Sequence, residues 1–148
     1  MMIEINNRTY HKINLNLVKR LVNKFARAYK VEQKEISIAF IGDAEIKKLN
    51  RAYRQKDEPT DILSFAPLNN AESDVTGQAG EDNFLGELVI DYSQIKRQAG
   101  QFDHSARQEM IFILVHGLLH LVGYDDKTER GRKQMIKLGE KFIKKLKI

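Results

Sequence analysis

The sequence predicts a single α+β domain spanning residues 1–148, and three observations support that prediction. A chain of 148 residues is long enough to bury one hydrophobic core. Its apolar content of 42% and charged content of 30% are ordinary for a globular protein. Alternating and helix-spaced apolar stretches are intermixed without a regular strand–helix repeat, which favours a layered α+β domain over a doubly wound sheet.

The N-terminal half predicts two strands and two helices. Apolar residues alternate over residues 3–5 and again over 36–40, the pattern of short strands. Residues 15–30 carry apolar side chains at helical spacing and predict an amphipathic helix. We expect Asp43 to cap the next helix and Tyr53 to lie on its apolar side.

The middle of the chain predicts two further strands separated by a long loop. Residues 62–65 form a short apolar run after Pro59, and residues 84–91 form a longer one. Residues 68–83 are polar, acidic and contain glycine, which is typical of a lid, a binding segment or a disordered loop. A short helix is expected after the strand at 84–91, ending near Gly100.

Two helices are predicted in the last third of the chain. Ser105 and Gln108 form a capping box for a helix that is apolar on most sides and therefore buried at the centre. Gly123 is a suitable terminator of that helix. The final helix is expected within residues 127–147, which carry nine Lys and Arg against two Glu.

Composition restricts the partners and the compartment. The 25 Lys and Arg against 20 Asp and Glu give a net charge of +5, which suits either nucleic-acid binding or a solubilising surface. No cysteine is present, so disulfides and thiolate ligands are excluded. The first residues lack the apolar core of a secretory signal, and the apolar run 110–115 is too short to span a membrane. We therefore expect a cytoplasmic protein without membrane attachment.

The stretch 116-HGLLHLVGYDD-126 predicts a metal centre. His116 and His120 are four residues apart and so share one face of a helix. Two neighbouring imidazoles in a core need polar partners, and one metal ion would satisfy both, although a structural pair is the alternative. If the helix ends at Gly123, Asp126 can fold back as a third ligand, with Asp125 in reserve.

Two neighbouring residues bear on that prediction. Asp126 and Glu129 also form a capping box for the final helix, a role that competes with metal ligation. Gly117 occupies the position where a zinc peptidase carries its glutamate base, so peptide hydrolysis is disfavoured. We expect this small residue to leave open space beside the metal, with room for a bulky substrate.

The stretch HGLLHLVGYDD resembles the H-G-x-L-H-L-x-G-Y-D-H signature of the YbeY-type rRNA maturation factors, which are metal-dependent endoribonucleases. The stretch 49-LNRAYRQKDEPTDILSF-65 is similar to a second block of that family, and 85-LGELVID-91 to a third, weaker one. The resemblance covers essentially the whole chain. It implies a four-stranded mixed sheet with about five helices and a zincin-like metal-binding helix. It also implies a zinc ion held by three histidines, of which His116 and His120 match two and Asp126 takes the place of the third.

The resemblance implies single-strand-specific RNA cleavage in rRNA processing, at the 3′ end of 16S rRNA, and in ribosome quality control. The implied partners are single-stranded RNA, rRNA and ribosomal particles, with a ribosomal protein or a GTPase as a further partner. Arg54 matches the family's important arginine, and its guanidinium would stabilise the phosphate. The alternative is that Arg54 only pairs with Asp57, Glu58 or Asp61 on the surface. Lys56 and the final helix could add electrostatic attraction for RNA.

Asp126 changes what the resemblance implies for the metal. A carboxylate ligand lowers the charge of a divalent site, and two histidines with one carboxylate suit Fe(II), Mn(II) or Ni(II) as well as zinc. We expect one divalent ion, with zinc the first choice. The departure also keeps open a ribosome-associated assembly factor that acts by binding and has a weak metal site. A non-haem iron oxygenase is disfavoured, because such ligand sets normally lie in β-barrels.

Overall fold

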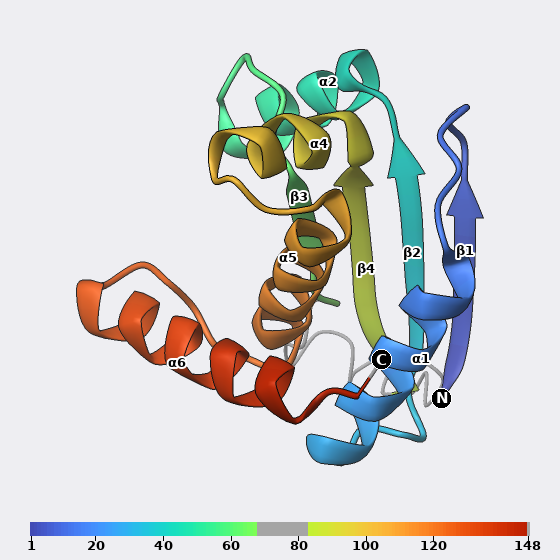
Figure 1. Cartoon of the computed structure of the whole chain (residues 1–148), viewed down its shortest axis with the longest axis vertical. Helices are drawn as coiled ribbons and strands as arrows, with labels where there is room; N and C mark the ends of the chain where they lie inside the picture. Colours follow the sequence, from blue (N-terminus) through green and yellow to red (C-terminus); the bar gives the residue numbers. More distant parts are fainter. Residues whose placement is uncertain (68–82, 148) are drawn as a thin grey trace, which may run out of the picture.

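The computed structural model describes residues 1–67 and 83–147, which form one four-stranded sheet and five helices (Figure 1). The strands are β1 (Met2–Asn7), β2 (Glu35–Ile41), β3 (Ile62–Phe65) and β4 (Phe84–Asp91). The helices are α1 (Leu15–Ala28), α2 (Asp43–Arg54), α4 (Tyr92–Gln101), α5 (Ala106–Leu121) and α6 (Glu129–Lys145). The strand order is β1-β2-β4-β3, with β3 antiparallel to β4 and the other pairs parallel. The predicted α+β fold with a mixed sheet is confirmed.

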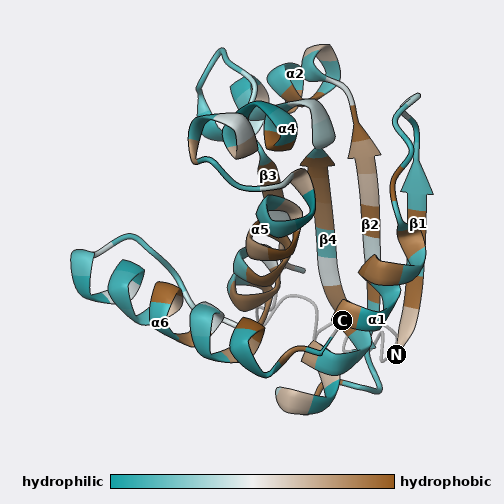
Figure 2. Cartoon of the chain, in the orientation of Figure 1, coloured by the Kyte–Doolittle hydropathy of each residue, from teal (hydrophilic) through white to brown (hydrophobic). Residues whose placement is uncertain are grey.

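The two faces of the sheet are covered unequally. Side chains of β2 and β4 pack on one face against α1, α4, α5 and α6 in the main core. On the other face, Ile46 of α2 joins Ile41, Leu63 and Val89 in a smaller cluster. The strands β2 and β4 and the middle of α5 are the most hydrophobic segments in Figure 2. Helix α5 is therefore the buried central helix that the sequence predicts.

Close packing fixes α5 against the sheet. The predicted capping box is present, with Ser105 and Gln108 each bonding the backbone of the other. A Cβ atom at Gly117 would lie 2.6 Å from Cδ1 of Ile62 and 3.0 Å from Cδ2 of Leu88. The expectation that Gly117 leaves open space is therefore wrong, because strand side chains fill that position.

Two other local expectations need correction, and a third falls mostly on residues that the structure does not describe. Gly42 is the N-cap of α2, and Asp43 is instead its first residue. Tyr53 lies on the apolar side of that helix only in part, because its ring centroid is 5.1 Å from that of Phe65 while 65% of the residue is exposed. Of the loop predicted at 68–83, residues 68–82 lie outside the described residues. Within the described ranges, no helix is both long and apolar enough to cross a membrane.

Candidate metal centre and the cavity around it

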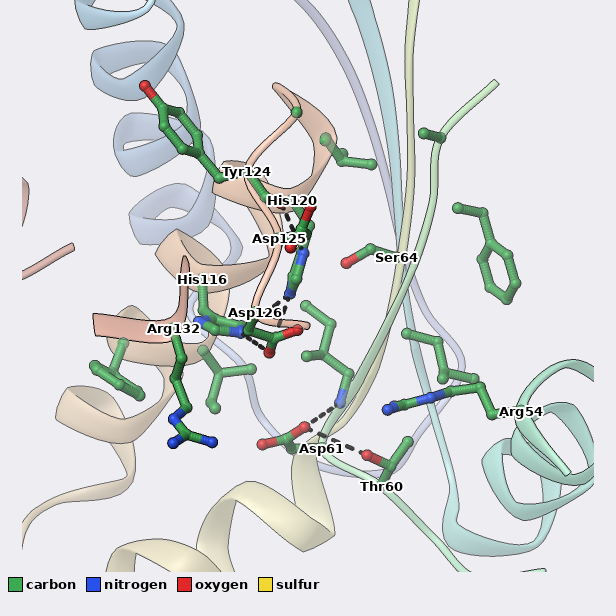
Figure 3. Close-up of a pocket in the computed structure, with 18 of the residues that line it drawn as sticks. Arg54, Thr60, Asp61, Ser64, His116, His120, Tyr124, Asp125, Asp126 and Arg132 are labelled. Atoms are coloured by element: carbon green, nitrogen blue, oxygen red, sulfur yellow. Dashed lines mark hydrogen bonds and ion pairs between the residues drawn. The ribbon is translucent and has the colours of Figure 1, made fainter. Parts of the chain in front are cut away.

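Three side chains converge at the C-terminal end of α5 (Figure 3). The Nε2 atoms of His116 and His120 lie 3.2 Å apart. Oδ2 of Asp126 lies 3.5 Å from Nε2 of His116 and 3.7 Å from Nε2 of His120. The three residues that the sequence singled out thus present one ligand atom each to a common point.

The chain beyond α5 folds back as the sequence predicts. Gly123 has φ +107°, a conformation that favours glycine, and its N–H donates to the carbonyl of His120. The carbonyl oxygen of Tyr124 then lies 3.0 Å from Nδ1 of His120. An Nδ1–H that donates to this oxygen leaves the lone pair of Nε2 directed toward His116 and Asp126.

The geometry of the three atoms fits a small divalent ion. Ligands about 2.1 Å from a tetrahedral zinc lie about 3.4 Å from one another, close to the three distances found here. Burial lowers the pKa of His116, and the neighbouring His120 lowers it further, while Asp126 acts in the opposite direction. A neutral imidazole is the form that binds a metal. The donor set can therefore hold a divalent cation.

The structure shows which of the expected roles, metal ligation or helix capping, is open to Asp125 and to Asp126. Thr128, not Asp126, is the N-cap of α6, and its hydroxyl accepts the N–H of Gly131. The capping box expected from Asp126 and Glu129 is therefore absent. Asp125 accepts the backbone N–H of Lys127 and is not among the convergent ligand atoms. Asp126 is thus left unused by the helix terminus.

The three side chains line a cavity of about 950 Å³ between α2, β3, α5 and α6. Arg54, at the end of α2, lines the same cavity (Figure 3). Its side chain has no hydrogen bond or ion pair within the described part of the chain, whereas Arg51 lies 3.9 Å from Asp57. The surface pairing considered for Arg54 is therefore not found among these residues.

Two charged residues of the cavity were not proposed from the sequence. The sequence suggested Asp61 only as a partner of Arg54. In the structure Asp61 immediately precedes β3, and its carboxylate accepts the N–H of Ile62 at 2.7 Å. Arg132 was counted only within the basic final helix. Arg132 lies six residues after Asp126, and only the turn before α6 decides that both residues line the same cavity.

A chain of hydrogen bonds supports Asp61 from behind. Nε2 of Gln98 donates to Asp61 at 3.2 Å and to the buried Glu109 at 2.8 Å. Nε2 of His104 lies 2.6 Å from the other oxygen of Glu109. Helices α4 and α5 thereby fix the orientation of the Asp61 carboxylate at the edge of the cavity.

Comparisons with known proteins find relatives over most of the chain. A protein family model described as Endoribonuclease YbeY matches residues 2–147. The Endoribonuclease YbeY of Halalkalibacterium halodurans is 38% identical over 86% of this chain and 82% of its own length. That of Shouchella clausii is 40% identical over 87% of this chain and 83% of its own length.

A solved structure shares the fold. The solution structure of TM1509 from Thermotoga maritima matches with a TM-score of 0.63 and 26% identity, over 96% of this chain and 87% of its own. The family model covers nearly the whole chain, and the two relatives, at 38% and 40% identity, cover most of it. These matches determine the family of the protein. The chain belongs to the YbeY endoribonuclease family.

Proposed function

We propose that this protein is a metal-dependent, single-strand-specific endoribonuclease of rRNA maturation, acting at the 3′ end of 16S rRNA and in ribosome quality control. The observation that carries the proposal is the convergence of His116, His120 and Asp126 in a cavity that also holds the guanidinium of Arg54, which has no partner among the described residues. Membership of the YbeY endoribonuclease family supports the reaction class. Single-stranded RNA is the substrate proposed for this cavity, with rRNA in ribosomal particles as its natural source.

The protein's own residues have distinct roles in this mechanism. His116, His120 and Asp126 would hold a divalent cation, whose chemistry is the polarisation of a phosphoryl oxygen and the activation of water. Arg54 binds the phosphate and stabilises the negative charge that develops on it in the transition state. The hydrogen bond to the Tyr124 carbonyl keeps His120 in the required orientation.

Asp126 sets the character of the centre. One carboxylate among three protein ligands leaves a divalent site with a charge of about +1 rather than +2. We propose zinc as the first choice, with nickel, manganese and iron(II) also suited to this ligand set. The preference among these ions should differ from that of a three-histidine centre.

RNA cleavage by the purified protein tests the proposal. Wild type should cleave a single-stranded RNA, and a chelator should abolish the reaction. Arg54→Ala should lower kcat by about 100-fold, the effect of removing one transition-state donor, while metal content is unchanged. Arg51→Ala is the matched control, because Arg51 lies on the same helix but faces Asp57 rather than the cavity.

Two results would contradict this assignment. Cleavage that persists in chelator would remove the metal from the mechanism, and equal activity of Arg54→Ala and wild type would remove the arginine. Retained RNA binding without cleavage would instead support an assembly factor that acts by binding. We further propose a cytoplasmic location and contact with a ribosomal protein or a GTPase, which co-purification with ribosomal particles can test.

A further inference from the structure

Arg132 is a cation on the side of the proposed metal centre away from Arg54. It is the fourth residue of α6, and Figure 3 shows the two arginines on either side of Asp126. The side chain of Arg132 has no ion pair or hydrogen bond to the described residues, and Glu129 of the same helix pairs with Lys133 instead. Both guanidiniums line the same cavity and are exposed to solvent.

The charges of the cavity give Arg132 a defined role. Among the described residues that line it, three carboxylates (Asp61, Asp125 and Asp126) oppose two guanidiniums. A divalent ion at the centre would bring the total to roughly +1, and removing Arg132 would reduce it to about zero. Arg132 therefore offsets the negative charge that Asp126 adds, and it keeps the cavity attractive to phosphates.

Each arginine has an aromatic residue in the same cavity. Tyr53 precedes Arg54 and is 65% exposed. Phe112 of α5 is 38% exposed, and its ring is nearly parallel to that of His116, with centroids 6.5 Å apart. Exposed aromatic rings beside cations are the elements that bind single-stranded nucleic acid, because bases stack on the rings and phosphates pair with the cations.

We propose that Arg132 binds a phosphate of the RNA on the α6 side of the metal centre, so that the strand crosses the cavity from α2 to α6. This inference rests on the proposed function and adds a substrate-binding residue and a path for the strand. Arg54 contacts the phosphate that reacts, and Arg132 contacts a neighbouring phosphate that does not. Arg132 therefore contributes to binding in the ground state and the transition state alike.

Binding to an RNA that cannot be cleaved tests this role. The probe is a fluorescein-labelled 2′-O-methyl oligoribonucleotide of roughly a dozen nucleotides, measured by anisotropy at several salt concentrations. Arg132→Ala should weaken binding about 10-fold and reduce the magnitude of the salt slope by about 0.7, the value for one phosphate contact on a single strand. Arg130→Ala is the matched control, because it removes the same charge from α6 at a residue outside the cavity lining.

Kinetics separates this inference from the proposed function. With a cleavable RNA, Arg132→Ala should raise KM about 10-fold with kcat nearly unchanged, whereas Arg54→Ala should lower kcat. Arg132→Lys should recover most of the affinity. Equal affinities for Arg132→Ala and Arg130→Ala would overturn the inference even if wild type cleaves RNA. A selective loss of binding in Arg132→Ala would support it even if wild type cleaves nothing.

Discussion

Two clusters of ionisable side chains lie near the ends of secondary-structure elements. The chain supplies partners for the groups of one cluster, whereas the other cluster faces a cavity. In the first, Asp43, Asp91 and Arg97 meet beyond the carboxyl ends of β2 and β4. In the second, His116 and His120 meet Asp126 at the end of α5. The first is closed by partners from the chain, and the second opens into a cavity.

The closed cluster supplies its own hydrogen bonds. Asp91 is 0% exposed, and its Oδ1 accepts the N–H groups of Ser93 and Gln94 at the start of α4. Both carboxylate oxygens of Asp43 accept from the guanidinium of Arg97, at 2.7 and 3.1 Å. These hydrogen bonds stabilise the fold because they compensate polar groups that are partly or fully buried.

The open cluster directs its ligand atoms at one another. Two imidazole nitrogens and a carboxylate oxygen converge, and no Lys or Arg of the described residues pairs with that carboxylate. Such an arrangement contributes little to folding by itself and becomes favourable when a cation binds. The comparison indicates a structural role for the closed cluster, and it leaves the open cluster as the candidate ligand site.

The largest expected effect is a difference in the free energy of unfolding between variants of the two clusters. Asp91→Ala removes a helix cap and the buried partner of Asp43, so we expect the free energy of unfolding to fall by about 2–4 kcal/mol. His116→Ala, measured in chelator, should cost less than about 1 kcal/mol, because His116 is only partly buried and its polar contacts are to His120 and Asp126, the other two proposed ligands. Urea unfolding of both variants measures the difference. A larger loss for His116→Ala would reverse the comparison.

Sequence reasoning recovered the open cluster and missed the closed one for a physical reason. His116, His120 and Asp126 lie within eleven residues, so helix periodicity and one glycine terminator suffice to bring them together. Asp43 begins α2 just after β2, whereas Asp91 ends β4, and only the parallel pairing of β2 with β4 makes them neighbours. Residues joined by long-range pairing carry no local spacing signal.

The same limit explains the errors near the metal centre. The tight approach of α5 to β3 and β4 decides that Gly117 is a packing residue, and no local pattern gives that distance. Thr128 displaces Asp126 as a helix cap because the turn places its hydroxyl next to the N–H of Gly131. The order of strands and helices was predictable, since it depends on local apolar periodicity.

Metal-linked stability gives the next largest effect. A cation that binds only the folded protein should raise the free energy of unfolding by about 2.7 kcal/mol at 100 times its Kd. Thermal unfolding with added zinc should show this gain in wild type and no gain in His120→Ala. Asp126→His should retain the gain with a changed order of preference among zinc, nickel and manganese.

A variant of the closed cluster is the control for that measurement. Asp91→Asn should gain as much stability from zinc as wild type does, because Asp91 lies outside the proposed ligand set. Equal gains in wild type and His120→Ala would place the cation elsewhere. Loss of the zinc effect in Asp91→Asn would show that the two clusters are not independent.

The last expected effect is a pH dependence that arises in the closed cluster. Burial, together with the hydrogen bond and the charge of Asp43, raises the pKa of Asp91 to about 7, while the guanidinium of Arg97 lowers the pKa of Asp43 to about 2. Oδ1 of Asp91 accepts two backbone N–H groups and the buried Oδ2 accepts none from the described residues, so we expect a proton on Asp91 to reside on Oδ2.

The sign of this effect follows from where the proton is bound. Below about pH 4, both folded and unfolded protein hold the proton of Asp91, and its stabilising contribution is complete. Between about pH 4 and 7, only the folded state holds it, so this contribution is lost as the pH rises. Asp91→Asn keeps a donor toward Asp43 at every pH and should therefore gain stability relative to wild type as the pH increases from 4 to 8. Parallel stability curves for the two proteins, measured by urea unfolding, would show that Asp91 is ionised in the fold.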